Sequence, residues 1–119
     1  MSNKPNADSE PGDEAAAKLK QTVGRCELCG WVGPDNLVCH EILRGNPLRR
    51  LARGVRCCCL ILCNEWANDC HGMMGGRPWE WQLAILWRSR PTDFDLLHFW
   101  KIAGRRKPEV EELLAEVTK

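Results

Sequence analysis

The sequence predicts a small α+β domain built around a metal site, with a polar tail before it and a helical extension after it. Three observations support this prediction. Cysteines recur in pairs, short apolar segments over 37–42 and 55–62 resemble strands, and apolar residues beyond residue 78 recur at helical spacing. A chain of 119 residues is the size of one domain.

The N-terminal segment is rich in Asn, Asp, Glu, Pro, Ser and Ala and has no aromatic residue. This composition predicts a disordered tail over 1–21, with a short helix over 15–20 as its only regular structure, and order from about Val23. The segment does not resemble a secretion signal, and no run approaches the roughly 18 apolar residues of a membrane helix. We therefore expect a cytoplasmic protein that does not contact a membrane.

The chain has eight cysteines, which in a protein without an export signal favour metal binding over disulfides, because cytosolic thiols stay reduced. The first pair, Cys26 and Cys29, flanks a tight turn in which Gly30 can take a positive φ angle, as in a zinc knuckle. The second pair, Cys63 and Cys70, should follow the second strand, and His71 is an alternative to Cys70. The predicted ligands of one structural zinc ion are Cys26, Cys29, Cys63 and Cys70.

The other cysteines have a simpler interpretation. Cys57, Cys58 and Cys59 lie on the second predicted strand and alternate in direction, so all three cannot join one metal site. Reduced cysteine behaves as a small buried hydrophobic residue, and Cys39 is expected to do the same. One of the three could still replace Cys70 as a zinc ligand.

Helical spacing governs the C-terminal third of the chain. A short helix is expected over 64–71, and a longer one over 78–88 with Pro at its first position. Another should follow over 92–103, with Thr92 as its N-cap. A last amphipathic helix is predicted over 105–119.

The net charge is only +1, but positive charge is concentrated in one segment. Residues 44–56, most of which are expected to form a loop, carry no acidic residue and five arginines, Arg44, Arg49, Arg50, Arg53 and Arg56. The guanidinium group binds phosphate oxygens in pairs, so these residues are candidates for nucleic-acid contacts. A solvated charged loop is the alternative.

In order and spacing, these pieces resemble the HNH, or ββα-metal, nucleases, particularly the short members common in phages. The resemblance covers roughly residues 24–104 and rests on Cys26-Glu27-Leu28-Cys29-Gly30, Val38-Cys39-His40-Glu41-Ile42 with Arg44-Gly45, Leu60-Ile61-Leu62-Cys63, Cys70-His71 and the segment 82–91. The sequence departs from the family at two positions. Cys58 or Cys59 stands where the family has its middle Asn, and Trp66 stands where the last pair has its second Cys.

In that family, a His on the first strand is the general base for attack of water on a phosphodiester, and a divalent metal holds the scissile phosphate. The resemblance implies that His40 is the base or a metal ligand and that Glu41 takes the other role. It implies that His71 is a metal ligand, and that Mg²⁺ or another divalent cation is the catalytic cofactor. Duplex or branched DNA would be the substrate.

The sequence is thus interpreted as a ββα-metal (HNH-like) core with a structural zinc knuckle and a helical extension over 22–104. The predicted function is metal-dependent DNA cleavage by a phage-encoded endonuclease in the host cytoplasm, with other phage proteins as candidate partners. The alternative is a non-catalytic zinc module that binds nucleic acid or a protein. The His40-Glu41 pair favours cleavage and the absent Asn favours binding. A thiol redox protein is disfavoured, because no thioredoxin-like Cys-x-x-Cys lies in a βαβ setting.

Overall fold

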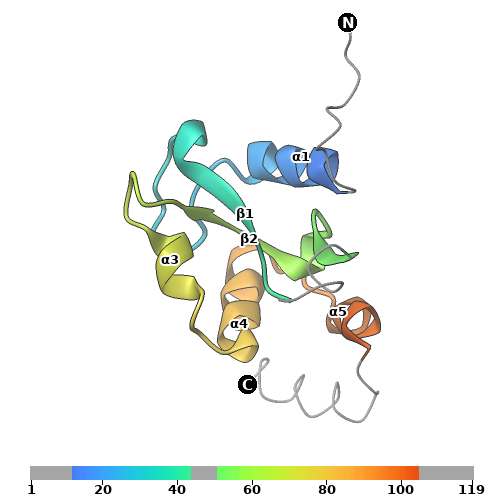
Figure 1. The fold of residues 1–119 in the computed structure, drawn as a ribbon. Coiled ribbons are helices and arrows are strands. Elements are labelled where there is room, and N and C mark those ends of the chain that lie inside the picture. Colours follow the sequence, from blue (N-terminus) through green and yellow to red (C-terminus); the bar gives the residue numbers. More distant parts are fainter. Residues whose placement is uncertain (1–11, 44–50, 105–119) are drawn as a thin grey trace, which may run out of the picture.

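The computed structural model of the chain describes residues 12–43 and 51–104. These residues form a two-stranded antiparallel sheet with helices on both sides (Figure 1). Strand β1 (Leu37–Glu41) and strand β2 (Cys59–Cys63) make up the sheet, and both were expected as strands. The small α+β class is thereby confirmed.

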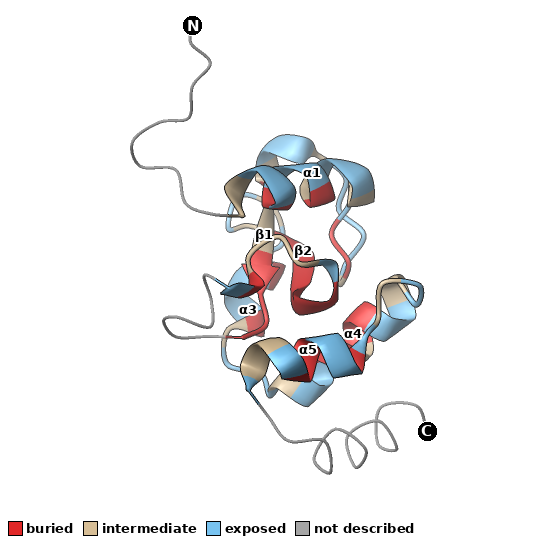
Figure 2. Ribbon diagram, turned by 90° about the vertical axis from the view of Figure 1, so that its right-hand side faces the viewer, coloured by how far each residue is buried: buried red, intermediate tan, exposed pale blue. Residues whose placement is uncertain are grey.

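Strand β2 is the centre of the core. All five of its residues are buried, because helix α1 covers one side of the hairpin while helices α3 and α4 cover the other (Figures 1 and 2). The strand was expected to start at residue 55, but Arg56–Cys58 forms a 3-10 turn (η2) in which the Cys58 amide donates to the Val55 carbonyl. An apolar run alone does not distinguish such a turn from a strand.

Helix α1 (Asp13–Val23) occupies much of the segment that composition assigned to a disordered tail. The expected short helix over 15–20 lies inside it. Ala16 and Leu19 are buried against the sheet, at the three-residue spacing of one helix face. Ala, Leu, Lys and Gln are strong helix formers, so the same residues that lower hydrophobicity here also favour a helix. The tail prediction is therefore wrong from residue 13 onward, while residues 1–11 lie outside the described part.

Helix α3 (Cys70–Met74) is shorter and later than the helix expected over 64–71. Residues 65–68 form turns, and Asp69 adopts a left-handed conformation with φ 53°. A non-glycine residue in that region interrupts a right-handed helix. The Asp69 carboxylate accepts a hydrogen bond from the Gly72 amide at 3.3 Å and so caps α3.

Helix α4 (Trp79–Ser89) lies close to the helix expected over 78–88, but Pro78 is its extended N-cap and not its first residue. The helix turns Gln82, Leu83 and Leu86 toward the core. Helix α5 (Leu96–Ala103) starts three residues later than its predicted N-cap, Thr92, implies. Its N-cap is Asp95, not Thr92, since the Asp95 carboxylate accepts from the His98 amide at 3.1 Å.

The C-terminal helices are joined by aromatic packing. The ring of Trp79 on α4 lies 4.9 Å from that of Trp100 on α5, and Phe99 lies 5.3 Å from Trp100. None of the helices in residues 12–43 and 51–104 has both the length and the apolar character needed to cross a membrane. The predicted helix over 105–119 lies outside the described residues.

Candidate metal centres

The four cysteines predicted as zinc ligands meet at one end of the hairpin. Cys26 and Cys29 come from the loop after α1, Cys63 ends β2 and Cys70 begins α3. Their Sγ atoms all lie within 4.8 Å of one another, and all four thiols are reduced. The structure therefore brings together the complete predicted set, and this cluster could hold a metal ion.

The spacing of the sulfur atoms agrees with a shared ion. Tetrahedral zinc with Zn–S bonds of 2.3 Å separates its sulfurs by about 3.8 Å. The Sγ atoms of Cys29 and Cys63 are 3.7 Å apart, nearly twice the length of a disulfide bond. In the described part of the chain, the donor group contains Cys70 and does not contain His71, so Cys70 completes it.

The knuckle turn is built by its own backbone. The Gly30 amide donates to the Cys26 carbonyl at 3.0 Å, and the Cys26 amide donates to the Trp31 carbonyl at 2.8 Å. Gly30 has φ 87°, as the sequence predicted, and the Cys29 amide lies 3.5 Å from the Cys26 sulfur. This local geometry explains why the first pair was readable from spacing alone.

The second half of the cluster depends on residues that sequence reasoning missed. The Asn64 carbonyl accepts the amides of Ala67 and Asp69, which folds the segment back toward β2. The Asn68 side chain then donates to the Cys29 sulfur at 3.3 Å. Burial opposes ionisation of Cys29, but hydrogen bonds from Asn68 and the knuckle outweigh it and lower the pKa of this thiol to about 6. Only the preference of Asn for turns hints at this role.

A buried ion-pair network anchors the knuckle to the rest of the fold. The carboxylate of Glu27 accepts from the Ile61 amide at 2.8 Å and from the Arg90 guanidinium at 2.8 Å. Arg90, at the end of α4, also pairs with Asp93 at 2.9 Å. These ion pairs raise the pKa of Arg90 against the opposing effect of burial. Glu27 and Arg90 are 63 positions apart, so no local pattern could have identified the pair.

Two of the three predicted catalytic residues meet on the α3 side of the hairpin. The rings of His40 and His71 have centroids 5.3 Å apart at an interplanar angle of 74°. His40 is buried, and its Nε2 lies 2.6 Å from Oε1 of Gln82. The Gln82 amide nitrogen donates to the Arg77 carbonyl, which fixes the orientation of the amide group. Because Oε1 can only accept, Nε2 of His40 carries a proton, and in the neutral imidazole the lone pair is then on Nδ1.

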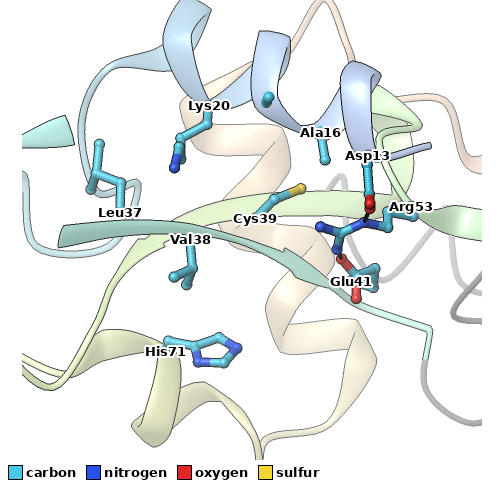
Figure 3. A pocket seen from close by; sticks show the side chains of 10 residues that line it. Asp13, Ala16, Lys20, Leu37, Val38, Cys39, Glu41, Arg53 and His71 are labelled. Atoms are coloured by element: carbon cyan, nitrogen blue, oxygen red, sulfur yellow. Dashed lines mark hydrogen bonds and ion pairs between the residues drawn. The ribbon is translucent and has the colours of Figure 1, made fainter. Parts of the chain in front are cut away.

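Glu41 lies on the opposite side of the strand. Successive residues of a strand point to opposite faces, so Glu41 turns toward α1 when His40 turns toward α3. Its carboxylate accepts from Arg53 at 2.9 Å, and Arg53 also pairs with Asp13 of α1 (Figure 3). Figure 3 shows His71 across β1 from this ion pair, and at the edge of the strand His71 lines the same pocket as Glu41 and Arg53. Among the described residues, no cluster of three or more metal-binding side chains joins Glu41 to His40 and His71.

The arginines expected to contact phosphate divide into two groups. Arg53 bonds to two carboxylates, and Arg56 pairs with Asp93 at 3.4 Å while remaining exposed. Arg44, Arg49 and Arg50 lie outside the described residues. The described members are thus engaged with acidic side chains of the same fold.

Cys57, Cys58 and Cys59 are all buried, which agrees with the interpretation as core residues. The sulfurs of Cys57 and Cys58 are 3.8 Å apart in the η2 turn. Among the described residues, none of the three belongs to the four-thiol cluster. Cys59 instead faces the α1 side of the hairpin, together with Cys39 and Glu41.

Comparison with known proteins adds no relative to this geometry. Protein-family models, curated proteins and solved structures were compared with the chain, and none matches it. The function is therefore inferred from the residues of the site themselves.

Proposed function

We propose that the protein is a metal-dependent endonuclease of the HNH type that hydrolyses phosphodiester bonds in DNA. The observation that carries the proposal is the contact between His40 and His71. Two imidazoles that bind one ion through bonds of 2.1 Å have ring centres about 5 Å apart. The measured 5.3 Å is therefore suited to two ligands of one ion. Strands β1 and β2 and helix α3 also follow one another in the order that a ββα-metal core requires.

The four-thiol cluster is assigned to a structural zinc ion. Four thiolates make a soft, closed donor set, which is typical of zinc sites that stabilise a fold. Cys70 belongs to this cluster, and His71 is the next residue of α3. A zinc ion that fixes Cys70 would therefore also fix the backbone that carries the His71 ring opposite β1.

The chain's own residues prepare the two imidazoles for metal binding. Gln82 holds the proton of His40 on Nε2, which selects the tautomer with its lone pair on Nδ1. Imidazole nitrogens suit manganese, cobalt or zinc better than magnesium, which prefers oxygen ligands. A divalent cation held there would stabilise the negative charge that develops on phosphate during hydrolysis. Glu41 is directed at Arg53, so it is not assigned the role of base.

The proposal is tested by nicking of supercoiled plasmid with Mn²⁺, Co²⁺, Zn²⁺, Mg²⁺ or EDTA. His40→Ala and His71→Ala should each reduce cleavage on the order of 100-fold or more, because each removes one side of the ion site. The matched control is His98→Ala, since His98 is an exposed histidine on α5 away from the pair. The structural zinc of the four-thiol cluster, measured before any metal is added, should be the same in all variants. Cleavage by His40→Ala at the wild-type rate would refute the proposal.

A non-catalytic zinc module is the second candidate, and one observation favours it. His40 is only 7% exposed and its hydrogen bond to Gln82 is fully formed, as expected for a structural histidine. This candidate predicts nucleic-acid binding without cleavage in every metal. If Arg49 and Arg50 contact phosphates, their joint replacement by Ala should weaken binding and flatten its dependence on salt.

A further inference from the structure

We propose that the α1 side of the hairpin carries a second metal site, in which Cys39, Cys59 and Glu41 bind a zinc ion. The donor atoms of these three residues all lie within 4.8 Å of one another. The sheet register explains their convergence. Glu41 is paired with Cys59, and Cys39 is two positions before Glu41, so the three side chains share one face. The proposal does not depend on the proposed nuclease function.

The placement of the two thiols favours a bridging ion over a disulfide. Cys39 is paired with Ile61, so Cys59 is its diagonal neighbour across the strands. Diagonal neighbours in an antiparallel pair lie about 7–8 Å apart, whereas the Cα atoms of a disulfide usually lie about 4.4–6.8 Å apart. An ion with two bonds of 2.3 Å can span the wider gap. The two thiols are reduced in this structure.

The surroundings balance the charge of such a site. Two thiolates, one carboxylate and a zinc ion together carry about one net negative charge. Arg53 supplies a positive charge next to it, since its Nη1 donates to Oε2 of Glu41 at 2.9 Å. A carboxylate has two oxygen atoms, so Glu41 can bind Arg53 through one and an ion through the other. Metal-binding carboxylates are commonly oriented by hydrogen bonds of this kind.

Access to the site comes from a pocket at the outer edge of β1. The pocket has a volume of about 380 Å³, and its lining includes Cys39, Glu41, Arg53 and Lys20 (Figure 3). Cys59 is fully buried behind it, while Cys39 is half-buried. Three protein ligands with an open fourth position are typical of zinc sites that bind water or a small molecule. The pocket would therefore give a solvent molecule access to the fourth position.

The test is the metal content of the full chain after loading with zinc and removal of unbound ions. Wild type should hold one zinc ion more than Cys39→Ser, whether or not His40 and His71 also bind zinc. The control is Cys57→Ser, which changes a buried cysteine that belongs to neither donor group and should keep the zinc content of wild type. With Co²⁺, Cys39→Ser should lose on the order of one third of the thiolate-to-metal absorption, because two of six thiolate bonds would be lost.

Equal zinc content in wild type and Cys39→Ser, with equal helix content, would overturn the proposal. So would an equal loss of metal in Cys57→Ser. If Cys39→Ser does not fold, Glu41→Gln decides, because it keeps both thiols. We expect it to lower the affinity for the ion at Cys39 and Cys59 about tenfold and to leave the affinity of the four-thiol cluster unchanged. Zinc content and affinity equal to those of wild type in Glu41→Gln would refute the site. The comparison of Cys39→Ser with wild type changes neither His40 nor His71, so the two proposals fail separately.

Discussion

The two faces of strand β1 carry different donor atoms and depend on different helices. On one face, His40 meets His71 of α3, and the four-thiol cluster holds the start of that helix. On the other face, Cys39 and Glu41 lie beneath α1, which is tied to the hairpin through Asp13 and Arg53 (Figure 3). Imidazoles therefore face α3, while thiols and a carboxylate face α1.

The difference shows how one short strand could serve the two proposed sites, because its side chains alternate. Consecutive residues of β1 cannot act on the same ion unless the strand bends, whatever their chemical types. Loss of the four-thiol cluster should disrupt the His40–His71 pair on the α3 side. Loss of the packing of α1 should disrupt the group formed by Cys39, Cys59 and Glu41 on the other side. Four substitutions test this separation, beginning with the largest expected effect.

Cys63→Ser should release α3 from the hairpin and destabilise the whole domain. Cys63 is fully buried at the end of β2, and structural zinc can contribute on the order of 10 kcal/mol in small domains. We expect no cooperative thermal transition by circular dichroism and loss of the structural zinc ion. A strong chelator should have the same effect on wild type. A variant that melts like wild type would show that the cluster does not stabilise the fold.

Arg90→Ala should lower the stability of the whole domain, and so affect both sides of β1 together. The reason is that the Glu27–Arg90 pair joins the knuckle to β2 and α4. Removing Arg90 leaves the fully buried carboxylate of Glu27 without its cation, which typically costs about 3–5 kcal/mol. Denaturation in urea should show the loss. Arg88→Ala, an exposed change on the same helix, should stay within about 0.5 kcal/mol of wild type. Equal stability of the two variants would contradict the role of the network.

Leu19→Ala should affect the α1 face selectively. Leu19 is 2% exposed between α1 and the sheet, and a buried Leu→Ala change costs about 2–5 kcal/mol. The four-thiol cluster should keep its metal, while ions bound at Cys39 and Cys59 should dissociate more easily. Zinc titration monitored by metal content distinguishes the two losses. The control is Lys18→Ala, an exposed position of the same helix. An equal loss of zinc affinity in the four-thiol cluster and at Cys39 and Cys59 would show that the two sides of β1 are coupled.

Asn68→Ala should have the smallest effect and act only on the α3 face. Asn68 helps to lower the pKa of Cys29 to about 6, so its removal should raise that pKa toward the usual thiol value. A lowered pKa stabilises the folded state above the unfolded value near 9, and this contribution is lost as the pH falls through about 6. Zinc should therefore leave the variant at a higher pH, with affinity about tenfold weaker near neutrality. An unchanged release curve would exclude this role of Asn68.

Local chemistry decided how much of the molecule was predictable. Cys26, Cys29 and Gly30 form a turn whose geometry depends on adjacent residues, so spacing was sufficient. Cys63 and Cys70 followed from the return of the chain after β2. The Glu27–Arg90 pair was not predictable, because its partners are brought together only by the folded core.

The predicted positions of helices α1 and α5 differ from the structure for two physical reasons. The composition of α1 is polar, and a burial face of Ala16 and Leu19 is too small to stand out in a hydrophobic pattern. Thr92 and Asp95 are both good N-caps, and only the packing of α5 selects Asp95. The separation of Glu41 from His40 could have been deduced from strand alternation, which the family resemblance had obscured.

The span of the four-thiol cluster also sets an order of events during synthesis. Cys26 and Cys29 emerge long before Cys70, which lies 44 positions after Cys26. At about 5–20 residues per second, the ribosome needs roughly 2–9 s to add that length. During this interval the unfinished cluster has only Cys26 and Cys29, and later Cys63, to bind an ion. The cluster can therefore close only after α3 has been translated, and a chain that stalls earlier retains an incomplete set of ligands.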